Sequence, residues 1–212
     1  MAAFARTATT TSTYAAESTK PGGEVTGTMS GVSDPARHAL SGKSQARTPT
    51  SAVTREVELT IIRDDLYLRD GVPSAPGTWT HMSAARAPVA ASSNFAAIVS
   101  LFAAAGPGIV DAEKTGPGAF KGTFDPAKAA RSSLGPSERG PQIPYEAYEA
   151  TVDTSGYVTA LVLPPSSDAA GIAQNTTTIH LSDIGKPVTI AAPPAADVKE
   201  ISEDAYKLYG GS

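Results

Sequence analysis

Alternation of apolar and polar residues is the clearest pattern in the chain, and it predicts strands joined in hairpins. In residues 55–63 (REVELTIIR), Val57, Leu59 and Ile61 alternate with polar residues. A period of two places one set of side chains on a buried face of a strand and the other set in water. Residues 66–68 (LYL) follow after a two-residue turn and predict the returning strand of an antiparallel hairpin.

A second hairpin is predicted in the last third of the chain. Residues 145–152 and 157–163 have the composition of strands, and the segment DTSG at 153–156 predicts the turn between them. The segment 108–118 has few β-forming residues, so a strand there is expected to be short or absent. Further short strands are predicted at residues 24–30, 38–45, 176–181 and 188–190.

Helical periodicity is strongest in residues 92–105 (SSNFAAIVSLFAAA), whose exposed face carries no charge. Its apolar side chains recur at i, i+3, i+4 and i+7, at Phe95, Ile98, Val99 and Phe102. Weaker patterns predict helices at residues 1–20 and 125–134, and near the C-terminus through Val198, Ile201, Ala205 and Leu208. Segregated helices and hairpin-linked strands predict an α+β fold with an antiparallel sheet.

The composition narrows the class of protein. The chain has 212 residues, about one domain's length, with 18% charged residues, a net charge of −4 and no cysteine. Small residues dominate, so the core is expected to be modest or partly hollow. Disulfides and cysteine-ligated metals are excluded, no apolar run is long enough to span a membrane, and no basic cluster indicates a nucleic-acid partner. Residues 1–4 (MAAF) lack the basic and apolar regions of a signal peptide.

Patterns for catalysis and metal binding are missing from the sequence. The histidines His38, His81 and His180 have no metal-ligand spacing, and no nucleophile-elbow or phosphate-loop motif occurs. His180 falls on the polar side of a predicted strand. Asp64 and Asp65 are interpreted as turn residues, because Asp is favoured there by local hydrogen bonding. We therefore expect no enzyme activity, no metal and no cofactor.

Four segments resemble the LppX/LprG group of envelope lipoproteins, which share the LolA-like fold. They are REVELTIIRDDLYLRDG (55–71) followed by Trp79-Thr80, the apolar helix at 94–105, GAFKGTFDPAKAA (118–130), and TVDTSGYVTALVLPP (151–165) with TTTIHLSDIGKPVTIAAPPAADV (176–198). The last pair is the most specific. These motifs shape turns and strand starts, so they bear on the fold more than on chemistry.

The resemblance implies a strongly curved antiparallel sheet, a half-barrel, with helices packed on its concave face. Residues 1–212 are expected to form a single domain, with residues 193–212 as a C-terminal tail or short helix. The space between sheet and helices is expected to hold acyl chains. The expected lining of this apolar cavity is Val57, Leu59, Ile61, Leu66, Leu68, Phe95, Ile98, Val99, Phe102 and Leu161.

The function implied by the resemblance is non-enzymatic lipid binding or lipid transport in the bacterial cell envelope. It also implies an exported precursor, anchored to the membrane through a lipid on a cysteine upstream of Met1. From the residues alone, an ordinary filled core is favoured over a cavity for the same apolar side chains. The alternative function is then an envelope surface interaction or signalling module without a lipid ligand.

Overall fold

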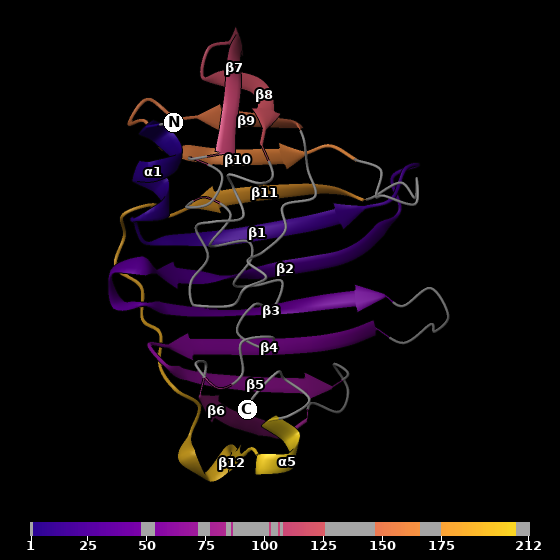
Figure 1. Ribbon diagram of the computed structural model, residues 1–212, viewed down its shortest axis with the longest axis vertical. Coiled ribbons are helices and arrows are strands. Elements are labelled where there is room, and N and C mark those ends of the chain that lie inside the picture. Colours follow the sequence, from indigo (N-terminus) through magenta and orange to yellow (C-terminus); the bar gives the residue numbers. More distant parts are fainter. Residues whose placement is uncertain are drawn as a thin grey trace.

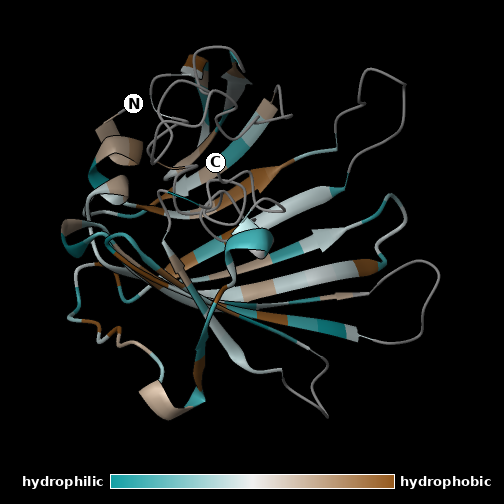
Figure 2. Cartoon of the chain, turned by 60° about the horizontal axis from the view of Figure 1, so that its bottom comes forward, coloured by the Kyte–Doolittle hydropathy of each residue, from teal (hydrophilic) through white to brown (hydrophobic). Residues whose placement is uncertain are grey.

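The computed structural model describes residues 2–47, 54–71, 77–83, 86, 102, 106, 108–125, 147–165 and 175–206. In these residues the chain forms a large, open, curved sheet, shown face-on in Figure 1 and tilted in Figure 2. Its strands are β1 (Ser12–Thr19), β2 (Val25–Asp34), β3 (Ala39–Arg47), β4 (Thr54–Ile62), β5 (Asp65–Gly71), β6 (Trp79–Ser83), β7 (Ile109–Gly116), β8 (Ala119–Phe124), β9 (Ala147–Val152), β10 (Val158–Leu163), β11 (Thr176–Ser182) and β12 (Val198–Glu200). The helical elements are α1 (Ala2–Ala8), η1 (Pro35–Arg37), η2 (Ala195–Asp197) and α5 (Glu203–Tyr206).

Two antiparallel meanders make up the sheet, whose strand order is β12-β6-β5-β4-β3-β2-β1-β11-β10-β9-β8-β7. Strands β1 to β6 form one meander and β7 to β11 form the other, and the pairing of β1 with β11 joins them (Figure 1). Among the described strand pairs, β12 with β6 is the parallel one. Segments from both ends of the chain therefore share a single sheet.

Both hairpins predicted from the sequence are confirmed. In the first, Leu59 lies opposite Leu68 in the β4–β5 register, and Arg63 in the turn has a φ of 57°. In the second, which joins β9 to β10, the turn begins at Asp153 and ends at Gly156 with a φ of 82°. Glycine suits that left-handed conformation because it has no Cβ. Local turn chemistry and alternation thus specify these two units.

The prediction of a helix over residues 1–20 is confirmed for Ala2–Ala8 and wrong for the strand that follows. α1 ends at Ala8, and Ser12–Thr19 forms β1 instead. Ser12, Tyr14 and Ala16 are buried in alternation with more exposed residues, as expected of a strand. β1 pairs with β2 on one side and β11 on the other, so both neighbours satisfy its backbone groups. Tertiary pairing therefore overrides a weak helical pattern in a threonine-rich segment.

Three further expectations need correction. Ile109–Gly116 forms β7, although few β-formers occur there, because β8 supplies its backbone hydrogen bonds. The strand predicted at Val188–Ile190 does not form, because these residues pair with no strand of the described chain. They belong to the connection between β11 and β12, which runs along the ends of the strands (Figure 1). Val198 lies in β12 on the exposed edge of β6, and α5 starts only at Glu203. The start of the predicted C-terminal helix is therefore an added strand, and the described helical part is limited to α5.

The helices expected on the sheet are only partly described. Residues 92–105 and 125–134 lie outside the described residues, apart from Asp125 and Phe102, which is helical. α1 lies at the ends of β10, β11 and β1 (Figure 1), so a helix-packed concave face is not shown by the described residues. No helix of this described part has the length and apolar composition of a membrane span.

Candidate functional site

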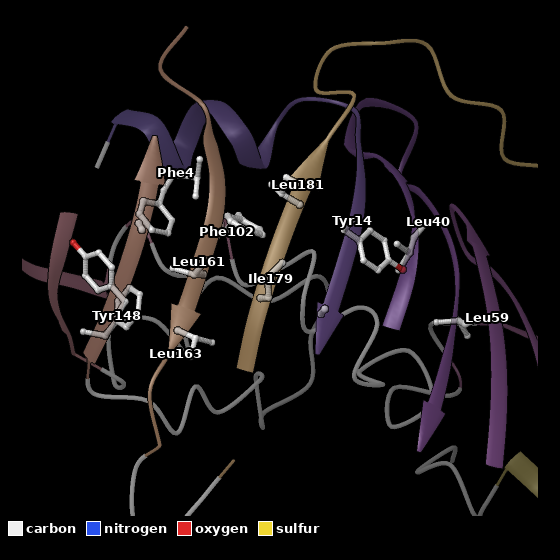
Figure 3. Packing of buried hydrophobic residues seen from close by; sticks show 14 of the residues in the cluster. Phe4, Tyr14, Leu40, Leu59, Phe102, Tyr148, Leu161, Leu163, Ile179 and Leu181 are labelled. Atoms are coloured by element: carbon white, nitrogen blue, oxygen red, sulfur yellow. The ribbon is translucent and has the colours of Figure 1, made fainter. Parts of the chain in front are cut away.

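One face of the sheet, here called the inner face, carries the buried apolar side chains. It contains Tyr14, Leu59 and Leu161, and Figure 3 shows labelled members of the cluster from both meanders. The strand registers place these side chains on one side of neighbouring strands, since Tyr14 is opposite Leu181 and Leu161 is opposite Ile179. The largest fully buried side chains are Tyr14, Leu59, Leu66, Met82, Val158, Leu161, Leu163 and Ile179.

The opposite face, the outer face, is charged where β3, β4 and β5 cross it. Lys43 Nζ lies 3.3 Å from Glu56 Oε2, and Arg69 pairs with Glu58. The Arg69 guanidinium also lies 4.9 Å from the centroid of the Trp79 ring. Cross-strand ion pairs of this kind suit a solvated surface. In these strands the inner face is therefore mainly apolar and the outer face polar, and the Arg55–Asp70 ion pair lies on the inner side of β4 and β5.

Seven of the ten cavity residues expected from the sequence fall in or against one buried cluster. Four lie in the cluster itself, at Leu59, Leu66, Phe102 and Leu161. Three more are half-buried and pack against it, at Val57, Ile61 and Leu68. Phe95, Ile98 and Val99 lie outside the described residues.

Tyr14, like Leu40 and Met82, is an inner-face residue that the sequence analysis does not identify, and in its case the reason is the helix predicted over residues 1–20. Its ring lies over Gly31 of β2, where a Cβ would come within 2.5 Å of Tyr14 Oη. Gly42 of β3 is opposite Gly31, so two glycines leave room for the ring. Burial raises the pKa of Tyr14, which keeps the phenol protonated. The sequence signal for this strand is weak, because Ser12 is polar and Ala15 is apolar, which breaks the alternation around Tyr14.

An aromatic group closes the end of the inner face next to α1. Phe4 of α1 packs edge-on against Tyr148 of β9 with ring centroids 5.8 Å apart, and Phe102 lies 6.2 Å from Phe4. Phe124 of β8 lies 4.6 Å from Tyr148. Tyr148 also donates a hydrogen bond to the Asp111 carbonyl oxygen. α1 is thereby held against the C-terminal meander.

A small pocket lies beside this group, where α1, β1, β2 and β11 meet. Its volume is about 20 Å³, enough for a water-sized group. The buried hydroxyl oxygens Tyr14 Oη and Ser33 Oγ have no hydrogen-bond partner among the described residues, and both residues line the pocket. The described lining is Thr7, Ala8, Thr10, Ser12, Tyr14, Ser33, Pro35, Phe102 and Leu181.

A separate polar cluster centres on His81 of β6, on the outer face. Its Nε2 lies 3.0 Å from Asp65 Oδ1 and its Nδ1 lies 2.7 Å from Glu200 Oε1 of β12. The Tyr67 ring stacks beside the imidazole at 4.9 Å. Burial lowers the pKa of His81, but its two carboxylate partners outweigh this and raise it overall. No group in the described residues has the make-up of a metal site.

His180 is exposed on the outer side of β11, as the sequence pattern predicts. His38 has a φ of 50° and ends the short helix η1. Of the two predicted turn residues, Asp64 lies in the β4–β5 turn with Arg63, whereas Asp65 is the first residue of β5 and binds His81. Its role was missed because Glu200 and His81 are brought to it only by tertiary pairing.

No protein-family model and no curated protein matches this chain. Among solved structures, the crystal structure of LprF from Mycobacterium bovis is similar over 91% of this chain and 93% of that chain, with a TM-score of 0.48 and 14% sequence identity.

Proposed function

We propose that this protein is a non-enzymatic lipid-binding or lipid-carrying lipoprotein of the bacterial cell envelope. The observation that carries the proposal is the separation of the sheet into a buried apolar inner face and a charged outer face. Leu59 and Leu66 of one meander and Leu161 and Ile179 of the other are all fully buried. A continuous apolar surface with a few polar groups is the chemistry that an acyl chain requires.

The proposed contacts for the acyl chain combine residues of this face with residues of the helix predicted at 92–105. They are Val57, Leu59, Ile61, Leu66, Leu68, Phe95, Ile98, Val99, Phe102 and Leu161, as expected from the sequence. Each methylene removed from water contributes about 0.8 kcal/mol, so eight contribute about 6 kcal/mol before the cost of ordering the chain.

The proposal also includes an extracytoplasmic location and a membrane anchor through an N-terminal lipid. Its support is the resemblance of residues 151–165 and 176–198 to the closing strands of envelope lipoproteins. It takes residues 1–212 as one lipid-binding domain, because strands from both ends of the chain pair in the same sheet. The partners are then a lipid ligand and the membrane, with no nucleic acid.

Two neighbouring isoleucines provide a matched test. Ile61 packs against the apolar cluster on the inner face, and Ile62 is half-buried on the outer face. Ile61→Trp is expected to weaken binding of the fluorescent apolar probe N-phenyl-1-naphthylamine by about tenfold or more, because the added volume occupies the proposed site. Ile62→Trp is expected to leave probe binding unchanged. Circular dichroism and thermal unfolding check that both variants are folded.

Native mass spectrometry of the freshly purified protein is the second measurement. An added mass that matches an extractable lipid supports the proposal. Folded wild-type protein that carries no lipid and binds no probe would overturn it. Equal losses in the two isoleucine variants would remove the inner face as the binding surface.

One observation favours the alternative function, a surface interaction or signalling module with a filled core. The pocket beside Tyr14 has a volume of about 20 Å³, which holds a water-sized group but not an alkyl chain. In that case the inner-face side chains already fill their own space. A filled core predicts that the purified protein carries no lipid and does not bind the probe. It also predicts that Ile61→Trp is strongly destabilising, because the core has no room for the larger side chain.

A further inference from the structure

Two hydroxyl groups on the inner face are buried without a hydrogen-bond partner among the described residues. Tyr14 is 1% exposed and Ser33 is 3% exposed. Neither Tyr14 Oη nor Ser33 Oγ has a partner within hydrogen-bond distance. Taking a hydroxyl out of water without a partner is unfavourable, so such a pair in a native protein indicates a place for a bound polar atom.

The sheet holds both hydroxyls in position. In the β1–β2 register, Tyr14 is opposite Gly31 and Ser12 is opposite Ser33, so Tyr14 and Ser33 share the inner face. The Tyr14 ring lies over Gly31, and Figure 3 shows its hydroxyl directed toward Leu40. Because β1 and β2 each pair with a strand on both sides, their residues are already ordered and lose little conformational freedom when a ligand binds.

The pocket between them accepts a neutral group. Tyr14 and Ser33 both line it, together with Thr10, and its volume suits one water-sized group. No charged side chain occurs among its described lining residues. Thr7 and Ala8 on the lining belong to the last turn of α1, and the negative end of a helix dipole disfavours an anion. A carbonyl oxygen therefore fits better than a carboxylate or a phosphate.

We propose that this pocket is the polar subsite for an acyl ester, in which Tyr14 and Ser33 donate hydrogen bonds to the ester carbonyl oxygen. Phe102 and Leu181 line the pocket and are also members of the apolar cluster. The acyl chain therefore continues from these two residues along the inner face. This inference rests on the proposed function and adds to it the class of ligand. An alkane has no atom to satisfy the two hydroxyls, and a free carboxylate brings a charge that the pocket does not compensate.

The test compares three ligands of one chain length, namely decane, methyl decanoate and decanoate, by displacement of N-phenyl-1-naphthylamine. Wild-type protein is expected to bind methyl decanoate about fivefold or more tightly than decane, and decanoate no more tightly than decane. In the double variant Tyr14→Phe/Ser33→Ala, the ester is expected to fall to the affinity of decane while decane binding is unchanged. The phenyl ring retains the packing over Gly31.

Matched controls separate the hydroxyls of the pocket from other hydroxyls. Tyr148→Phe removes an inner-face hydroxyl that already has a partner, and Ser30→Ala removes one from the exposed side of β2. Both are expected to keep the ester preference. Equal binding of decane and methyl decanoate by the wild type would overturn the ester subsite but leave the proposed function standing. This result is expected if the two hydroxyls bind only a structural water. Failure to bind even decane would overturn the proposed function.

Discussion

Tyr14 and Gly31 lie opposite each other on β1 and β2, and the tyrosine ring occupies the space that a side chain at position 31 would need. A Cβ built there would come within 2.5 Å of Tyr14 Oη and 2.2 Å of the Ser41 carbonyl oxygen. The second of these atoms is backbone and has little freedom to move. The same arrangement recurs at Gly122, where a Cβ would lie 2.8 Å from Tyr148 Oη. Each meander thus has one tyrosine laid over one strand glycine.

Gly31→Ala is expected to lower the free energy of unfolding by about 1–3 kcal/mol, because the methyl group has to displace backbone as well as Tyr14. Gly27→Ala on the same strand is the control, since its Cβ would meet only the Gln45 carbonyl oxygen at 3.4 Å. Urea unfolding of both variants measures the difference. Equal stability of the two variants would contradict the close approach of Tyr14 to β2.

Thr7 joins α1 to the sheet through a buried hydroxyl. Its Oγ1 accepts a hydrogen bond from the Val158 backbone N–H at 2.9 Å and donates one to the Ala3 carbonyl oxygen at 2.8 Å. Thr7→Val is expected to cost about 1–3 kcal/mol of unfolding free energy, because the Val158 N–H is left buried without a partner. Thr9→Val changes an exposed hydroxyl of the same segment and is expected to have little effect. Thermal and urea unfolding compare the two.

His81 is expected to make stability depend on pH. The carboxylates of Asp65 and Glu200 raise its pKa above the ordinary value despite the opposing effect of burial, so the folded state favours the protonated imidazole. This stabilisation is complete below the unfolded-state pKa of about 6.5 and is lost as the pH rises through the higher folded-state pKa. The melting temperature is therefore expected to fall between about pH 6 and about pH 8.

The His81→Gln variant is expected to lose this part of the pH dependence. His180→Gln is its control, because His180 is exposed on β11. β12 is the element affected first, since Glu200 binds His81 and the Ile201 N–H donates to the His81 carbonyl oxygen at 3.0 Å. A wild-type melting profile identical in shape to that of His81→Gln would contradict the role of the pair.

The β9–β10 turn is stabilised by one carboxylate. Asp153 Oδ1 accepts hydrogen bonds from the backbone N–H groups of Ser155 and Tyr157, at 2.9 Å and 2.8 Å. Asp153→Ala is expected to lower the free energy of unfolding by about 1 kcal/mol, because both N–H groups lose their acceptor. Asp153→Asn retains an acceptor oxygen and is expected to lose less. Chemical denaturation of the two variants gives the comparison, and a larger loss for Asn than for Ala would contradict it.

The sequence by itself determined the two hairpins. In β4 and β5, alternation around Leu59 and Leu68 defines which face is buried, and at β9–β10 Asp153 and Gly156 define the turn. These signals are local, because strand register in a hairpin follows from a turn and from side chains a few residues away. Six of the residues proposed to contact a ligand lie in these hairpins and could be placed on an apolar face for the same reason.

Only the tertiary structure decided the rest. Residues 12–19 become a strand because β11, more than 150 residues away, pairs with them, and Val198 becomes a strand residue because the edge of β6 has free backbone groups. Likewise, the Tyr14–Ser33 pocket forms only where α1, β2 and Leu181 meet around β1. In each case the deciding backbone hydrogen bonds and buried contacts come from distant segments, so no pattern within a short window of sequence contains them.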